Sequence, residues 1–189
     1  MRLLFFVLTL VTSAVAIAAN TVGGTVALKG QQMFLKTDDP CNNYLVASNN
    51  EIALSALVKL APGDVITATG KKNPAHCTVS IDSVEYVGLR RMLGSWYSTE
   101  AVITVEDFNS MKFYAAEKDH KWSQTPIEYN YSLVPASGKE WVMFLSDSKS
   151  TQFGTIQFSR GSAVLKMYSS DTGALNKTLI LYRMTTGLN

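Results

Sequence analysis

The residues of this 189-residue chain that could do chemistry are few and widely separated. Asp119 precedes His120, and a carboxylate beside an imidazole has the composition of a general-base pair. Glu128 and Glu140 could face each other on neighbouring strands as paired carboxylates. However, Asp119 and His120 are adjacent in sequence, and adjacent residues of a strand point to opposite faces. The lysines on both sides of this pair are typical of a charged loop. We therefore predict no catalytic residue and no enzyme activity; the alternative is a secreted hydrolase whose site has no recognisable motif.

The two cysteines, Cys41 and Cys77, have two interpretations. Together with His76 they could form a metal site. On a strand, though, His76 and Cys77 would point in opposite directions and could not easily share one ion. In an oxidising compartment such a pair most often forms a disulfide, which would contribute roughly 3–4 kcal/mol in the chain-entropy model. We expect the disulfide, and no metal or other cofactor.

The N-terminus has the pattern of a secretory signal peptide. Met1-Arg2 gives a positive start, Leu3–Ala19 is an apolar run, and Ala16-Ile17-Ala18 fits the small-x-small rule for cleavage. We expect residues 1–19 to be removed, leaving a secreted or periplasmic protein with no stable membrane insertion. The alternative is a retained membrane anchor, although the run is short for a spanning helix and has no basic flank after it.

The composition is that of a folded chain with little net charge. Hydrophobic residues make up 47% of the sequence, charged residues make up 17%, and the formal net charge is +2. A protein that neutralises several nucleic-acid phosphates normally carries a cluster of basic residues. Lys71-Lys72 and Arg90-Arg91 are isolated pairs. We therefore expect no nucleic-acid partner.

One helix is expected in the first half, among several short strands. Glu51–Leu60 favours a helix with Asn50 as its N-cap. Its apolar spacing places Leu54, Leu57 and Val58 on the buried face.

The first half also resembles a known fold. A strand is expected at Cys77–Val87, and its apolar residues change face across Asp82-Ser83, which predicts a β-bulge. Five strands with one helix before the fourth resemble the oligonucleotide/oligosaccharide-binding (OB) fold, and the segments Leu60–Gly70 and Thr78–Tyr86 look like its last two strands. The resemblance implies a small five-stranded barrel over residues 20–91.

The second half predicts many short antiparallel strands joined by tight turns, and so a closed barrel or a sandwich. Tyr129 and Tyr131 share one face of a strand, and Trp141 and Met143 share one face of the next.

The strand that contains Trp141 has a second apolar face, formed by Val142 and Phe144. With two apolar faces, the strand either contacts the first half of the chain or presents one face as an exposed patch for a partner. Contact with the first half is slightly favoured.

Gly94-Ser95-Trp96, followed by Arg183 near the end of the last strand, resembles the lipocalin/calycin superfamily. The resemblance implies an up-and-down barrel over residues 92–189, in which Arg183 packs on Trp96 and closes one end. Gly94, Trp96 and Arg183 would then have structural roles. Short loops and a small size favour a barrel filled by side chains.

The expected architecture is therefore all-β, with two small antiparallel barrels and one short helix. The expected function is that of an exported, non-enzymatic binding protein whose partner is another protein or a small apolar ligand. Small Gly-x-Trp barrels include periplasmic protease inhibitors, so an inhibitor-like role is one form of this function. The alternative is a small-molecule carrier with an open cavity lined by Tyr129, Tyr131, Met143 and Met167.

Overall fold

The computed structural model describes residues 20–117, 121–136 and 138–184. These residues form an all-β structure with one short α-helix. No helix in the described segments is long and apolar enough to cross a membrane. The elements are β1 (Thr21–Lys29), β2 (Gln32–Lys36), β3 (Asn43–Ala47), α1 (Glu51–Leu57), β4 (Val65–Asn73), β5 (Thr78–Gly88), the 3-10 helix η1 (Arg90–Met92), β6 (Gly94–Tyr97), β7 (Ala101–Val105), β8 (Ser110–Ala115), β9 (Ile127–Pro135), β10 (Glu140–Ser146), β11 (Thr151–Ser159), β12 (Ser162–Tyr168) and β13 (Leu175–Arg183).

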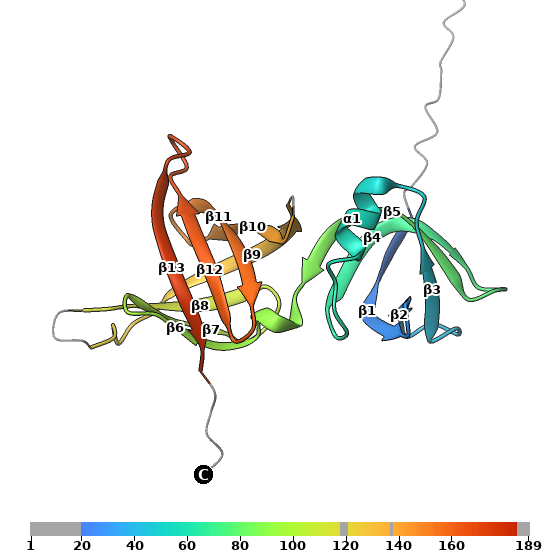
Figure 1. Cartoon of the computed structure of the whole chain (residues 1–189), viewed down its shortest axis with the longest axis horizontal. Helices are drawn as coiled ribbons and strands as arrows, with labels where there is room; N and C mark the ends of the chain where they lie inside the picture. The colour runs from blue at the N-terminus through green and yellow to red at the C-terminus, as the bar shows by residue number, and fades with distance from the viewer. Residues whose placement is uncertain (1–19, 118–120, 137, 185–189) are drawn as a thin grey trace, which may run out of the picture.

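Strands β6–β13 form a closed antiparallel barrel. Each strand pairs with the next along the chain, and β13 returns to β6 through the pairs Tyr182↔Tyr97 and Arg183↔Trp96. Closure removes the free edges that an open sheet would present. The prediction of an antiparallel barrel in the second half is confirmed. Figure 1 shows these strands on the left of the view.

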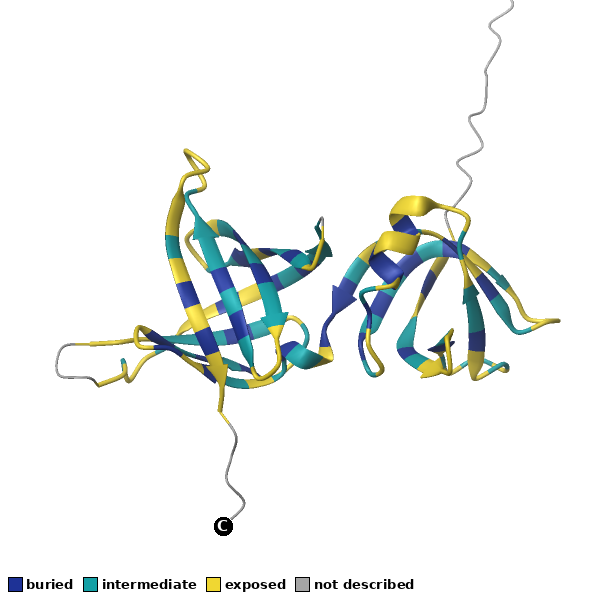
Figure 2. Ribbon diagram, viewed as in Figure 1, coloured by how far each residue is buried: buried dark blue, intermediate teal, exposed yellow. Residues whose placement is uncertain are grey.

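Alternation along each strand fills this barrel. Trp141, Met143 and Leu145 of β10 are buried, and the same two-residue period recurs on β7, β9, β11, β12 and β13 (Figure 2). Successive strand residues point to opposite faces, so alternate apolar positions meet at the barrel axis. The face that Trp141 and Met143 share is therefore the one that points into the barrel.

Strands β1–β5 form a second closed set of pairings. β1 pairs with β2, β2 with β3, β5 with β4 and β4 with β1, all antiparallel, whereas β3 pairs with β5 in parallel. Helix α1 connects β3 to β4. A single cross-pair, Val87↔Leu133, links β5 to β9, so all thirteen strands belong to one hydrogen-bonded sheet. The last residues of β5 and helix η1 lie between the two groups of strands in Figure 1.

The predicted bulge in β5 is confirmed. In the β4–β5 ladder, Thr69 pairs with Ser83 but Gly70 pairs with Ile81, so Asp82 is an extra residue. A second shift leaves Glu85 unpaired in the same way. Two extra residues restore the original face, which explains why apolar residues on both sides of the bulges reach the core.

The predicted buried face of α1 is partly wrong. Asn50 does cap the helix, because its side chain accepts hydrogen bonds from the N–H groups of Ile52 and Ala53. Leu57 is buried as predicted, but Leu54 is 41% exposed and Val58 is 77% exposed. The buried stripe consists of Ala53, Ala56, Leu57 and Leu60, which follow the i, i+3, i+4, i+7 spacing. The small alanine side chains let the helix approach the strands closely. The larger Leu54 and Val58 therefore lie on the neighbouring, exposed side of the helix.

Cys41 and Cys77 form a disulfide with a Cα–Cα distance of 5.6 Å. This spacing is typical of disulfides. The bond joins the β2–β3 connection to the residue before β5, and both segments belong to the N-terminal strands. The predicted disulfide is confirmed. Among the residues that the structure describes, no three metal-ligating side chains come together.

Candidate functional site

Trp96 of β6 and Arg183, the last residue of β13, pack together at one end of the barrel. The Arg183 guanidinium lies 5.2 Å from the centre of the Trp96 ring and donates to the carbonyl oxygens of Arg91 and Leu93. Trp96 is buried, and its Nε1–H donates to the carbonyl of Met92 at 2.9 Å. A planar guanidinium can stack and donate in plane at the same time. The structure thus brings together the pair that the lipocalin resemblance places at this corner.

Gly94 is required by the same corner. Its φ of +106° is unfavourable for residues with a side chain. A Cβ atom at this position would also lie 3.3 Å from Nη2 of Arg183. Gly94, Trp96 and Arg183 therefore form one structural unit.

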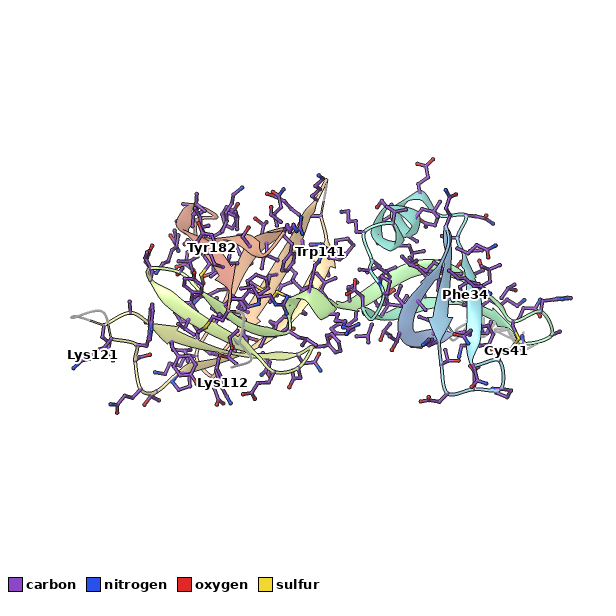
Figure 3. All side chains as sticks on the ribbon, turned by 60° about the horizontal axis from the view of Figure 1, so that its bottom comes forward. Phe34, Cys41, Lys112, Lys121, Trp141 and Tyr182 are labelled. Atoms are coloured by element: carbon purple, nitrogen blue, oxygen red, sulfur yellow. A yellow bond between two sulfur atoms is a disulfide. The ribbon has the colours of Figure 1, made fainter. Side chains whose placement is uncertain are left out.

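Sequence reasoning missed that this unit continues toward the N-terminal strands. Arg91 lies over Phe158 at 4.6 Å and over Trp141 at 5.6 Å, and Phe158 packs against Trp96 at 6.1 Å. The Lys59 Nζ also lies 5.8 Å from the centre of the Trp141 ring. Cations and aromatic rings thus form a continuous series from Lys59 to Arg183, in which Phe158 and Trp96 are adjacent rings. We call this series the cation–aromatic row, and Figure 3 shows Trp141 on the side of the barrel that faces the N-terminal strands.

Buried Asp64 connects the same region to the N-terminal strands. Its carboxylate accepts hydrogen bonds from the N–H groups of Ala61 at 2.7 Å and Arg90 at 2.8 Å. Burial raises the pKa of Asp64, while the two N–H donors and the guanidinium groups of Arg90 and Arg91 oppose the shift. Burial lowers the pKa of Arg91, and the charge of Asp64 opposes that shift. Asp64 therefore holds the start of η1 against the turn before β4.

The four residues proposed to line a cavity point into a filled interior. Tyr129, Tyr131 and Met143 are buried, and Met167 is partly buried against the same core. The Tyr131 hydroxyl donates to the carbonyl of Asp107 at 3.0 Å, and burial raises the pKa of Tyr131. The described residues leave a space of about 10 Å³ at the barrel centre, bounded by apolar side chains such as Met143 and Leu165. A ligand pocket normally needs about 300 Å³ or more.

The candidate carboxylates do not converge. In the β9–β10 ladder, Asn130 pairs with Ser146 at one end and Pro135 pairs with Trp141 at the other. Glu128 lies beyond the first end and Glu140 lies at the second, where Glu140 pairs with Lys166 at 3.3 Å. Asp119 and His120 fall outside the described residues.

The second apolar face of β10 is partly exposed. Phe144 is 44% exposed and pairs across the strands with Phe153, whose ring stacks on Tyr168 at 5.4 Å. The slightly favoured contact with the first half therefore does not cover Phe144. Phe144, Phe153 and Tyr168 instead lie side by side on the outer face of the barrel.

A larger apolar hollow lies on the N-terminal strands, and sequence reasoning did not find it. It has a volume of about 470 Å³ and is bounded by the β1–β2 hairpin, the end of β3 and helix α1. We call it the α1 groove; its lining consists of Leu28, residues 31–33, residues 45–48, Leu54, Leu57, Val58 and Leu60. The exposed side chains of Leu54 and Val58 belong to this lining. These are the two residues of the predicted buried face that the structure leaves at the surface.

Two other large hollows have charged side chains in their linings. One, of about 820 Å³, contains Lys112, Glu128 and Asp147. Its charges are already partnered in part: Lys112 pairs with Glu106 at 3.1 Å, and Asp147 accepts from the N–H groups of Lys149 and Ser150. The other, of about 790 Å³, contains Asp39, which pairs with Lys72. These local pairings favour solvated surface over a built ligand site.

Comparison of the chain with models of protein families, with curated proteins and with solved structures found no significant match.

Proposed function

We propose that this chain is an exported, non-enzymatic binding protein that recognises a protein partner through its surface. In this proposal, residues 1–19, which lie outside the described residues, act as a signal peptide. The disulfide between Cys41 and Cys77 is compatible with a secreted or periplasmic protein.

We further propose that the mature chain has two domains, residues 20–91 and residues 92–189. The pairing order β1-β2-β3-β5-β4-β1, with α1 between β3 and β4, supports an OB-like first domain. The up-and-down barrel and its Trp96–Arg183 corner support a lipocalin-like second domain. The near-neutral charge remains a reason to expect no nucleic-acid partner, despite the OB-like pairing order.

The contrast between the α1 groove and the barrel interior carries this proposal. The groove offers about 470 Å³ with exposed apolar side chains, whereas the interior offers about 10 Å³. Contiguous exposed apolar surface commonly marks a protein interaction site. A surface site therefore fits the molecule better than a carrier that holds its ligand inside the barrel.

Cross-linking in the exporting cell, combined with native mass measurement, tests this function. We expect discrete protein adducts after cross-linking, and a native mass equal to that of the mature polypeptide alone. A small apolar molecule retained in the native mass, without protein adducts, would favour the carrier instead. An inhibitor-like role predicts that the adduct contains a protease whose activity the mature protein lowers.

A further inference from the structure

The wall of the α1 groove contains an interruption in a β-ladder. Strands β2 and β3 pair through Lys36↔Asn43, Leu35↔Tyr44 and Phe34↔Leu45, and the ladder ends there. Both strands nevertheless continue, because β2 begins at Gln32 and β3 ends at Ala47. The next pairs in register would be 33 with 46, 32 with 47 and 31 with 48. All six of these residues line the α1 groove instead.

Each facing strand is paired only on its far side in this stretch. Gln32 and Met33 pair with Lys29 and Leu28 of β1, and residues 46 and 47 pair with β5. Successive residues of an antiparallel strand direct their backbone N–H and C=O groups alternately to the two neighbouring strands. Of Gln32 and Met33, one therefore directs its backbone groups into the groove. No backbone hydrogen bond crosses this stretch of the groove among the described residues.

The chemistry of the lining limits what can occupy the groove. The lining residues are apolar or neutral, and they include no charged side chain. Leu28, Leu54 and Val58 each expose at least 41% of their surface around it. A charged ligand would find no counter-ion there, whereas apolar side chains would cover surface that is now wet.

An extended peptide could pair with the backbone groups of the strand walls and also cover the apolar lining, whereas a helix could only cover the lining. A helix uses its backbone groups internally, so it would leave the groups of the strand walls unpaired. An extended segment can pair its own backbone with a strand edge and place alternate side chains on the apolar floor. The interrupted β2–β3 ladder therefore favours binding of an extended segment over binding of a helix.

We propose that the α1 groove binds an extended, uncharged apolar segment of a partner protein, which adds as a strand beside β2 or β3. This inference rests on the proposed protein-binding function and specifies the binding mode. The expected segment carries apolar residues at alternate positions, has no charge in its centre and lacks proline where its N–H must pair.

The test uses a phage-displayed library of random peptides selected against the mature, oxidised full chain. One enriched sequence is then made as a fluorescent synthetic peptide, and its Kd is measured by anisotropy. We expect the enriched sequences to alternate apolar and polar residues. We expect Val58→Lys to weaken binding by about tenfold or more, because it places a charge on an uncharged apolar surface without a partner.

Ile52→Lys is the matched control. Ile52 lies on the same helix with 79% exposure, close to the 77% of Val58, but it does not line the groove. We expect this variant to bind the peptide like the wild type. The helix dipole favours a cation at the end of α1 and disfavours one at its start, so any loss of stability should affect the control rather than Val58→Lys. Methylation of one alternate set of backbone nitrogens in the synthetic peptide, the set that faces the strand edge, should also abolish binding.

The possible failures are distinguishable. An enriched sequence with helical i, i+3, i+4 spacing, or one unaffected by methylation of either alternate set of backbone nitrogens, would overturn the extended mode. Equal binding by wild type and Val58→Lys would overturn the groove as the site, and so would a selection that enriches no sequence. In each of these cases, discrete protein adducts in the exporting cell would still uphold the proposed function, and their absence would remove it.

Discussion

Trp96 stabilises the barrel through several contacts at once. Its ring packs against Phe158 and under Arg183, and its N–H is bonded to the Met92 carbonyl. Removal of the Trp96 side chain leaves a cavity and breaks its hydrogen bond to Met92. The Arg183 guanidinium also loses the ring on which it packs. The corner therefore depends on Trp96 more than on the exposed Arg183.

The first prediction is that Trp96→Ala lowers the free energy of unfolding of the barrel by about 3–5 kcal/mol. Arg183→Lys should cost only about 1 kcal/mol, because a lysine keeps the charge but loses the planar stacking and one carbonyl bond. All three tryptophans lie in residues 92–189, so tryptophan fluorescence during urea unfolding reports on this half of the chain. An unchanged midpoint in Trp96→Ala would contradict the role assigned to this corner.

The second prediction concerns the buried carboxylate of Asp64. Burial raises its pKa in the folded state, so the folded protein takes up this proton at a higher pH than the unfolded chain does. This group therefore contributes stability below its unfolded pKa, and the contribution is lost as the pH rises through the folded pKa. The free energy of unfolding of wild type, relative to Asp64→Asn, should increase as the pH falls from 7 toward 4.

Urea unfolding of both proteins across this pH range measures that difference. Other titrating groups are common to the two proteins, so their contributions largely cancel. A difference that stays constant, or that falls with falling pH, would show that Asp64 is not held in a raised-pKa environment.

Among the elements, the disulfide-linked loops and helix α1 have separate tasks. The disulfide joins the β2–β3 connection to the start of β5, at the far ends of β2 and β3 from the α1 groove. At that end the ladder is intact, whereas at the α1 end it is interrupted. The covalent bond thus supports the paired end of a hairpin whose other end remains available to a ligand.

The third prediction is that the double substitution Cys41→Ser and Cys77→Ser lowers the stability of the N-terminal strands by about 3–4 kcal/mol, because the unfolded chain regains loop entropy. The fluorescence-detected unfolding of the barrel should change much less. Far-UV circular dichroism should therefore show an early transition that tryptophan fluorescence does not follow. Coincident shifts by both probes would mean that the two groups of strands unfold as one unit.

At the scale of the whole molecule, charged side chains join the two groups of strands beside the candidate binding surface. Lys59 donates to the Ala136 carbonyl and approaches Trp141, while its neighbours Val58 and Leu60 line the α1 groove. The Tyr86 hydroxyl adds a further link by donating to the Phe108 carbonyl at 2.8 Å. The barrel thus serves as a filled support that contacts Lys59, in the segment that follows helix α1 and borders the groove.

The sequence predicted those features that follow from local patterns. Strand alternation placed Trp141 and Met143 on one face of their strand, and the Gly-x-Trp motif with a late arginine located the corner formed by Trp96 and Arg183. The contacts of Arg91 were missed because its aromatic partners Trp141 and Phe158 lie 50 or more residues away, in strands with no motif of their own.

The α1 groove was missed for two physical reasons. In a helix of two turns, the choice of buried stripe depends on how closely the helix approaches the strands, and Ala53 and Ala56 permit an approach that hydrophobicity alone does not indicate. The end of the β2–β3 ladder at Phe34↔Leu45 is a tertiary feature, because both sequences retain strand character beyond it.

Site-specific photo-crosslinking in the exporting cell is the most direct test of the central claim, which is recognition of a protein at the α1 groove. A photoreactive phenylalanine derivative is introduced at position 58 or, as the matched control, at position 52. We predict a discrete protein adduct from position 58 and none from position 52. The account would be contradicted if position 58 gave no adduct while the purified protein retained a small apolar molecule.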